Sequence, residues 1–290
     1  MLVRVSSRAR AASNHAQQEI MGTRALLTAK DGPVVTLTID RPDAGNAIDL
    51  ELAAALRDAV RDAIADPGCA ALVIAASGRV FCAGGDLATI AGAADVPGHL
   101  RELALTLHEA MALLRESRLV VVAAVAGAAA GAGFALALNA DLVVAGESAR
   151  FLVAYSAVGL TPDTGLSYLL PRVVGAHRAT ELALLGRTLD AQTARDWGIV
   201  NEVVADSAVR DRAVELARTV ACGPLPAVAE TKRLLREGGA GSGADFRAHL
   251  DEEARVIVQT VTSDDARHRI QAFLARAVGP AVQPAARAAR

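Results

Sequence analysis

The sequence has few aromatic residues and few cysteines, and its charges nearly cancel. Aromatic residues make up 3% of the 290 residues and hydrophobic residues 52%, which predicts a core of Ala, Val and Leu. The net charge of −2 gives no electrostatic reason to expect a nucleic-acid partner. The three cysteines, Cys69, Cys82 and Cys222, lack metal-ligand spacing and are odd in number. This pattern disfavours a zinc site or a disulfide framework and favours a cytoplasmic location.

One long segment, residues 119–138, contains no charge and reaches the length of a membrane span. Its second half is mostly Ala and Gly, which contribute little transfer free energy and form poor continuous helices. We therefore expect a buried strand, loop and helix there, and no membrane partner. The segment also resembles a dinucleotide-binding turn, but Leu136 follows Gly131 and Gly133 where a third glycine belongs. Nicotinamide binding is a minor alternative.

The two ends of the chain differ in composition from its middle. Residues 1–22 are basic and lack the continuous apolar core of a secretory signal. Residues 279–290 are rich in Ala, Pro and Arg. We predict a flexible extension over residues 1–22 and a disordered tail over residues 279–290.

Between these ends, strands alternate with helices and then give way to helices. Alternating apolar residues predict a strand over residues 34–39, and apolar runs predict strands over residues 71–76, 119–126 and 142–145. Apolar residues four positions apart predict a first helix through Leu52, Leu56, Val60 and Ile64. After Gly159 the helical pattern continues to residue 277, which predicts an α/β fold with a C-terminal helical region.

Two glycine-rich loops follow apolar strands about fifty residues apart, one at 83–87 and one at 127–133. Glycines let main-chain N–H groups converge on a ligand oxygen without a side chain in the way. One N–H from each loop would stabilise negative charge on a single carbonyl oxygen. The pair of loops therefore predicts an oxyanion or enolate site.

Five motif-bearing segments occur in order, at 41–47, 81–87, 126–133, 140–141 and 159–165. Together they resemble the crotonase superfamily, the enoyl-CoA hydratases and isomerases, over about residues 25–277. The resemblance implies a spiral of repeated ββα units over residues 23–205, followed by a C-terminal helical region over residues 206–278. It also implies an acyl-CoA substrate and assembly as a homotrimer or a dimer of trimers.

The same resemblance implies roles for individual residues. The main-chain amides of Ala83 and Ala132 match the family's oxyanion hole. The implied acyl-CoA contacts are Ala44, Asn46, Ala47, Ala83, Gly84, Gly85, Asp86, Leu87, Ala132 and Tyr155. No metal is implied, and no separate cofactor, because CoA arrives as part of the substrate. From the residues alone, turn and cap chemistry explains Ala44, Asn46 and Asp86.

The sequence departs from the hydratase pattern at both positions where the family carries a catalytic glutamate. These positions are Ala135 and Tyr155. Alanine cannot move a proton, and a tyrosine with a pKa near ~10 is a poor base at neutral pH. Asp163 lies where some isomerases of the family carry an aspartate. Its apolar neighbours would raise the pKa of its carboxyl toward the range useful for a proton shuttle.

Several candidate residues have simpler explanations. Asp163 precedes Thr164 and a helical run, so it also fits the N-cap of that helix. His108 and Glu109 lie on a predicted helix without a convergent partner, which favours a surface or packing role. No base accompanies Cys82, and a small apolar filler is its better interpretation.

The sequence as a whole predicts an enzyme that shifts the double bond of an enoyl-CoA. In this prediction the amides of Ala83 and Ala132 hold the thioester carbonyl while Asp163 removes and returns a proton. Two alternatives stay open. One is an enoyl-CoA hydratase with an unconventional water-activating group, and the other is a catalytically silent acyl-CoA-binding relative in which Asp163 only caps its helix.

Overall fold

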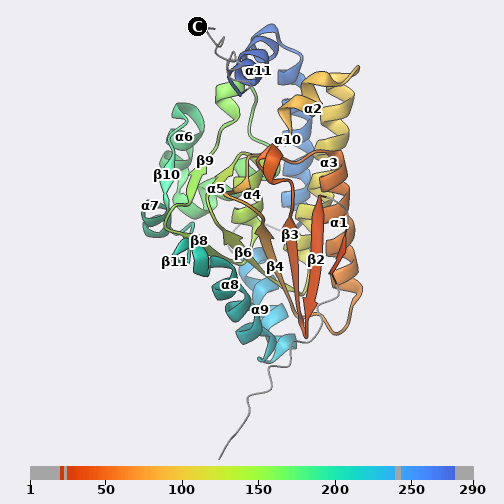
Figure 1. Ribbon diagram of the computed structural model, residues 1–290, viewed down its shortest axis with the longest axis vertical. Helices are drawn as coiled ribbons and strands as arrows, with labels where there is room; N and C mark the ends of the chain where they lie inside the picture. Colours follow the sequence, from red (N-terminus) through yellow and green to blue (C-terminus); the bar gives the residue numbers. More distant parts are fainter. Residues whose placement is uncertain (1–19, 23–24, 239–242, 278–290) are drawn as a thin grey trace, which may run out of the picture.

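A computed structural model describes residues 20–22, 25–238 and 243–277 of the chain. Two β-sheets lie at its centre, with helices on both faces of the larger sheet (Figure 1). The strands are β1 (Ile20–Gly22), β2 (Leu26–Asp31), β3 (Val34–Ile39), β4 (Ala71–Ala76), β5 (Val80–Cys82), β6 (Val120–Val125), β7 (Ala128–Ala130), β8 (Leu142–Gly146), β9 (Arg150–Leu152), β10 (Leu189–Asp190) and β11 (Glu202–Val204). The α-helices are α1 (Leu50–Ala65), α2 (Leu87–Gly92), α3 (Val96–Glu116), α4 (Ala132–Asn139), α5 (Leu166–Val174), α6 (Ala176–Leu185), α7 (Ala191–Asp196), α8 (Val209–Ala221), α9 (Leu225–Gly238), α10 (Gly243–Val261) and α11 (Asp264–Ala277). Short 3₁₀ helices are η1 (Pro42–Ala44), η2 (Tyr155–Val158) and η3 (Asp206–Ala208).

The larger sheet has seven strands in the order β1-β2-β3-β4-β6-β8-β11. The first three strands pair antiparallel, and β3 through β11 pair parallel. Every residue of β3 and β6 is buried, as expected for parallel strands covered on both faces. Helix α8 packs its small residues Ala213 and Ala217 against one face. Helix α1 lies against β2 and β3, and α3 packs on α1 (Figure 1).

A smaller sheet, in the order β10-β9-β7-β5, runs beside the repeating units of the fold. The strand pairs β4–β5, β6–β7 and β8–β9 each place their first strand in the larger sheet and their second in the smaller one. A helix follows each pair: α2, α4 and α5. This arrangement confirms the predicted spiral of ββα units, and helices α8 to α11 form the predicted helical C-terminal part.

The predicted strands over residues 34–39 and 71–76 correspond to β3 and β4. The predicted extension over residues 1–22 needs a correction, because its last three residues form β1 and pair with β2. Main-chain hydrogen bonds along the edge of β2 hold this strand. No apolar pattern in residues 20–22 predicts these bonds. Residues 1–19 and the predicted tail over residues 279–290 lie outside the described residues. The division at residue 205 stays a prediction.

The uncharged segment 119–138 forms β6, β7 and all but the last residue of α4, and these elements are almost entirely buried. The predicted strand, loop and helix are therefore confirmed. Within the described ranges, no helix combines the length and the apolar character that crossing a membrane requires.

Candidate active site

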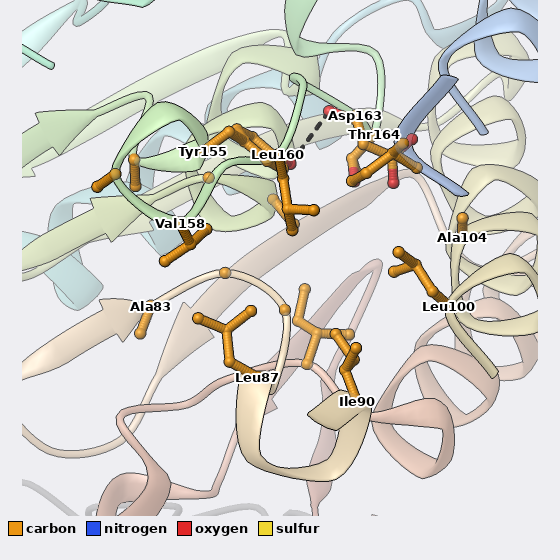
Figure 2. Close-up of a pocket in the computed structure, with 18 of the residues that line it drawn as sticks. Ala83, Leu87, Ile90, Leu100, Ala104, Tyr155, Val158, Leu160, Asp163 and Thr164 are labelled. Carbon is orange, nitrogen blue, oxygen red and sulfur yellow. Dashed lines mark hydrogen bonds between the residues drawn. The ribbon is translucent and has the colours of Figure 1, made fainter. Parts of the chain in front are cut away.

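An apolar pocket with a volume of about 240 Å³ lies between the β5–α2 loop, helix α3 and the loop around η2 (Figure 2). Helices α10 and α11 add Ile257 and Phe273 to its wall. The other large apolar side chains that line it are Ile48, Leu87, Ile90, Leu100, Leu103, Leu107, Leu152, Val158 and Leu160. Among the described residues, Asp163 is the one charged residue in this lining. The pocket therefore suits an uncharged hydrocarbon group beside a single carboxylate.

The two predicted glycine-rich loops touch each other at the edge of this pocket. Gly84 has a φ of +100°, and a Cβ on it would lie 3.1 Å from the carbonyl oxygen of Ala130. Gly133 packs so closely that a Cβ would lie 2.4 Å from the carbonyl oxygen of Cys82. Gly84 is required for its backbone conformation, and Gly133 is required because no space is left for a side chain. This close approach brings the start of α4 against the end of β5.

The amide of Ala83 is not available to a ligand, contrary to the prediction. Its N–H donates to the carbonyl oxygen of Gly45 at 3.0 Å. The neighbouring amide of Gly85 has no acceptor within the described part of the chain, and neither has the amide of Ala132. Gly85 and Ala132 both line the pocket. The pair of free amides is thus Gly85 with Ala132, because the turn at Gly45 engages Ala83.

Ala132 is also the first residue of helix α4. The N–H groups in the first turn of a helix have no intrahelical acceptor, and the helix dipole makes this end partially positive. An oxygen that gains negative charge is stabilised at such a position. The structure therefore brings the predicted residue Ala132 to a place where its main chain favours an anion.

Asp163 lies on the loop between η2 and α5 and is 5% exposed. Its Oδ1 atom lies 2.7 Å from Nε2 of His108 on α3. No side chain or amide of the described residues donates to its second oxygen, Oδ2. The N-cap of α5 is Gly165, and no hydrogen bond from a cap side chain is present there. The interpretation of Asp163 as a helix cap is therefore wrong, because its carboxylate pairs with His108 instead.

The backbone next to Asp163 is strained. Thr164 has a φ of +64°, which is unfavourable for a β-branched residue. The phenol of Tyr155 donates to the carbonyl oxygen of Asp163 at 3.3 Å, as the dashed line in Figure 2 shows. Burial, and then the charges of Asp163 and Glu253, raise the pKa of Tyr155 well above its ordinary value. Tyr155 therefore stays protonated and acts as a hydrogen-bond donor.

His108 is the site residue that the sequence analysis missed. It is buried on the inner face of α3, whereas Glu109 is exposed and pairs with Arg61 at 2.6 Å. Burial lowers the pKa of His108, but the charge of Asp163 and its hydrogen bond raise it by more, so its pKa lies above the ordinary value. The signal was present in the sequence: Leu100, Ala104 and His108 recur every four residues on the apolar face of α3.

Glu253 of α10 lies behind this pair. One ligand atom each from His108, Asp163 and Glu253 lie within 4.8 Å of one another. Such a set has the right residue types for a cation. The oxygens of Glu253 accept the amides of Gly165 and Ser167, at 2.5 and 3.0 Å. Hydrogen bonds within the protein therefore already engage His108, Asp163 and Glu253. The arrangement is suited to holding a proton.

The predicted acyl-CoA contacts divide into two groups. Ala83, Gly84, Gly85, Leu87, Ala132 and Tyr155 line the pocket. Asn46 is fully buried and its amide donates to the carbonyls of Ser77 and Val80, at 2.8 and 2.6 Å. Ala44 is exposed on the same turn and Ala47 is buried. These residues shape the loop that borders the pocket, and a direct contact of theirs with CoA stays a prediction.

Two further predicted residues have structural partners. Asp86 caps α2 through the amides of Ala88 and Thr89, both at 3.2 Å, and binds Arg41 at 3.1 Å. Burial raises the pKa of the Cys82 thiol to about 12. A thiol in this state is not a nucleophile at neutral pH, which agrees with its interpretation as an apolar filler.

The comparison with known proteins decides the family. The sequence profile described as enoyl-CoA hydratase/isomerase matches residues 29–278. The chain belongs to the enoyl-CoA hydratase/isomerase family. This crotonase is 34% identical over 255 residues to the 1,2-epoxyphenylacetyl-CoA isomerase of Escherichia coli strain K12, across 87% of this chain and 95% of that protein.

Other relatives of this crotonase carry different names. It is 31% identical over 242 residues to 4-chlorobenzoyl coenzyme A dehalogenase-2 of Arthrobacter sp, across 83% of this chain and 87% of that one. A solved enoyl-CoA hydratase from Bacillus halodurans has a TM-score of 0.79 and 26% identity, over 86% of this chain and 99% of that chain. Membership of the family therefore establishes the fold and agrees with an acyl-CoA substrate. The reaction must be inferred from the residues that line the pocket.

Proposed function

We propose that this crotonase isomerises the double bond of an enoyl-CoA, with Asp163 as the proton shuttle. The observation that carries the proposal is the buried carboxylate of Asp163 in an apolar pocket, hydrogen bonded to His108 on one oxygen only. A carboxylate held in this way is oriented and still has a free oxygen for a substrate C–H group. General base catalysis requires such an orientation before it requires a particular pKa.

The thioester carbonyl in this proposal binds the amides of Gly85 and Ala132. Asp163 Oδ2 removes a proton from the carbon next to the thioester of a 3-enoyl-CoA, and the electron pair moves onto the carbonyl oxygen. The two amides stabilise the resulting enolate without reorganisation. Asp163 then returns the proton at the γ carbon, so the double bond moves and the enzyme is unchanged. The reverse reaction uses the same groups.

The surroundings of Asp163 favour isomerisation over hydration. At the two positions where hydratases carry glutamates, Ala135 is fully buried and Tyr155 has a strongly raised pKa. Addition of water to a double bond needs groups that activate the water and deliver a proton. Within the described residues, Asp163 is the one carboxylate that lines the pocket. Hydration through Asp163 alone is the second candidate, and hydratases occur among the structural relatives.

The other parts of the proposal follow from the same chemistry. An isomerisation leaves the overall oxidation state of the substrate unchanged, so we propose that no redox cofactor takes part. We also propose that the reaction uses no metal and that CoA enters with the substrate. The apolar lining supports an uncharged acyl group, either an alkyl chain or a ring. Assembly as a homotrimer stays a proposal that light scattering of the purified protein tests, and a monomer would remove it.

Product analysis in deuterated water tests the reaction. A 3-enoyl-CoA and a 2-enoyl-CoA are incubated with wild type, with Asp163→Asn and with the control Asp58→Asn, which changes an exposed carboxylate on α1. We expect interconversion of the two enoyl-CoA isomers with deuterium uptake by wild type and by the control. Asp163→Asn should lose about 10²- to 10⁴-fold in kcat, the range for a general base.

Other outcomes would contradict the isomerase proposal. Formation of a 3-hydroxyacyl-CoA that persists in Asp163→Asn would indicate a hydratase with another base. Tight binding of enoyl-CoA without turnover of either isomer would indicate a silent acyl-CoA-binding protein. Release of chloride from 4-chlorobenzoyl-CoA, the substrate in the name of one relative, would make Asp163 a nucleophile instead. A fluorescence titration with NADH tests the nicotinamide alternative, and we expect no saturable binding.

A further inference from the structure

Glu253 is a buried carboxylate that the proposed reaction does not use. It lies on α10 and is 5% exposed. Its oxygens accept the amides of Gly165 and Ser167, at 2.5 and 3.0 Å, and the hydroxyl of Ser167. Gly165 is the N-cap of α5 and Ser167 is in its first turn. Glu253 therefore caps helix α5 from a residue 88 positions away in the sequence.

Helix α5 has no cap side chain of its own. A glycine stands at the N-cap and Thr164 precedes it in the left-handed region, with a φ of +64°. The amides at a helix start attract the nearest carboxylate through hydrogen bonds and the helix dipole. Without Glu253, that carboxylate would be Asp163, two residues before the N-cap. Capping by Asp163 would turn its carboxylate away from His108.

We propose that Glu253 is a positioning residue for catalysis, which holds Asp163 in the orientation needed for proton transfer by capping α5 in its place. The inference rests on the proposed function of Asp163. Glu253 also contributes through its charge, because this charge lies close to the side chains that gain and lose protons in the site. The C-terminal helix α10 thereby takes part in the active site although Glu253 does not line the pocket.

The charged and titratable groups that face Glu253 come from four parts of the chain. His108 lies on α3, Tyr155 on η2 and Asp163 on the loop between η2 and α5, and His249 lies on α10 with Nε2 at 3.5 Å from Glu253. The charge of Glu253 raises the pKa of His108, as do the charges of Asp163 and Asp251. Removing the charge of Glu253 should therefore lower the pKa of His108 and shift the pH dependence of kcat.

The variant Glu253→Gln tests the inference, because it keeps the size of the side chain and removes its charge. The NH₂ group of the new glutamine side chain would also face a main-chain N–H group at the start of α5, which needs an acceptor. We expect kcat to fall by about 10- to 100-fold, the effect of a misplaced catalytic group, with KM within about twofold. The matched control is Glu252→Gln, which changes an exposed glutamate paired with Arg255. This control should retain the wild-type kcat and pH profile.

A second readout does not depend on turnover. The imidazole resonances followed by NMR against pH give the pKa of His108, with His108→Asn to assign the signal. We expect a lower pKa of His108 in Glu253→Gln than in wild type and in Glu252→Gln. If Asp163→Asn is fully active, the proposed function fails, whereas this NMR measurement still reports on Glu253.

The inference is overturned if Glu253→Gln has the wild-type kcat and His108 pKa and differs only in thermal stability. If Glu253→Gln does not fold, Ser167→Ala replaces it, since it removes one donor to Glu253 and leaves the amides in place. Its kcat should fall about two- to fivefold, at the low end for the loss of one hydrogen bond, because the amides of Gly165 and Ser167 still hold Glu253. An unchanged kcat in Ser167→Ala would also overturn the inference.

Discussion

Two buried charged clusters in this crotonase differ in whether they reach the pocket. The site cluster, His108 with Asp163 and Glu253, places the carboxylate of Asp163 in the pocket lining. The structural cluster consists of Lys232, Asp141 and Arg236 and joins α9 to the larger sheet. Both clusters contain charges that burial alone would disfavour. The comparison separates a cluster that reaches the pocket from one that joins elements of the fold.

In the structural cluster, the ammonium group of Lys232 has three partners for its three N–H bonds. It donates to the carbonyl oxygens of Leu114 and Leu119, at 3.1 and 2.6 Å, and lies 3.0 Å from Asp141 Oδ2. Asp141 also pairs with Arg236 at 2.6 Å. The buried ammonium group of Lys232 has a full set of partners and stabilises the fold. Asp163 instead lines the pocket, where its second oxygen is available to a ligand. The predictions below test this distinction.

Among the variants that test this comparison, the largest effect on rate should come from an amide that has no partner among the described residues. Ala132→Pro removes the N–H at the first position of α4, where proline is well tolerated. We expect a loss of about 10²- to 10³-fold in kcat, as for other oxyanion-hole donors, with little change in the thermal midpoint. The control is Ala176→Pro, which also follows a glycine, at the first position of α6. Equal kcat values for the two variants would remove Ala132 from the oxyanion hole.

The structural cluster should show the opposite behaviour. Lys232→Met leaves Asp141 with one cation instead of two and removes one donor each from the carbonyl oxygens of Leu114 and Leu119. We expect a loss of about 3 kcal/mol in the free energy of unfolding, the low end for a broken buried ion pair because Arg236 remains. Urea unfolding measures it, and kcat should be unchanged. The chain's other lysine is the control: Lys30→Met removes an exposed ion pair and should leave the midpoint nearly unchanged.

A smaller effect on rate is expected at His108, which contacts Asp163 and not the substrate. His108→Leu removes the donor to Asp163 and should lower kcat by about 10- to 100-fold, as for a hydrogen bond to a charged group. His108→Gln retains an N–H donor and should recover much of this loss. His177→Leu, on the exposed side of α6, is the control. Full activity of His108→Leu would show that Asp163 does not need this partner.

The pH dependence of stability should have opposite signs in the two clusters. The pKa of His108 is raised above 6.5, so its contribution to stability is complete below about pH 6.5 and is lost as pH rises through the pKa of the folded state. Burial lowers the pKa of Lys232 from 10.5 to about 8, so the unfolded chain binds more protons between these values and stability rises with pH there.

Urea unfolding at a series of pH values measures both trends. The difference between wild type and His108→Gln should shrink above pH 6.5. The rise between about pH 8 and 10.5 should be present in wild type and absent in Lys232→Met. Slopes of the same sign in both comparisons would contradict the contrast between the clusters.

Much of the fold follows from local patterns. Alternation of apolar residues with threonine predicted the position of β3. An unbroken apolar run predicted that of β4, because a strand covered on both faces has no polar alternation. The glycine-rich loops also followed from the sequence, since the close approach at Gly133 admits no side chain. The strand β1 did not follow, because it depends on main-chain pairing along an edge rather than on its own side chains.

The candidate site was less accessible from the sequence. The sequence indicated Asp163 and the two loops, but it assigned the free amide to Ala83 instead of Gly85. Which amide stays free depends on a contact with Gly45, 38 residues earlier, through a hydrogen bond that no local pattern contains. In the same way, the periodicity of α3 predicts that His108 lies on the inner face, but it does not predict which group His108 contacts there.

The sequence by itself determined the alternation of strands and helices and the two glycine-rich loops, since periodicity fixes which faces are buried and glycine marks where chains approach closely. The family resemblance implied the ββα repeat and the place of Asp163. Only the tertiary structure decided that this carboxylate pairs with His108 while Glu253 caps the helix in its place. The physical reason is that a buried polar group must find a partner, and these partners come from elements 55 and 88 residues away along the chain.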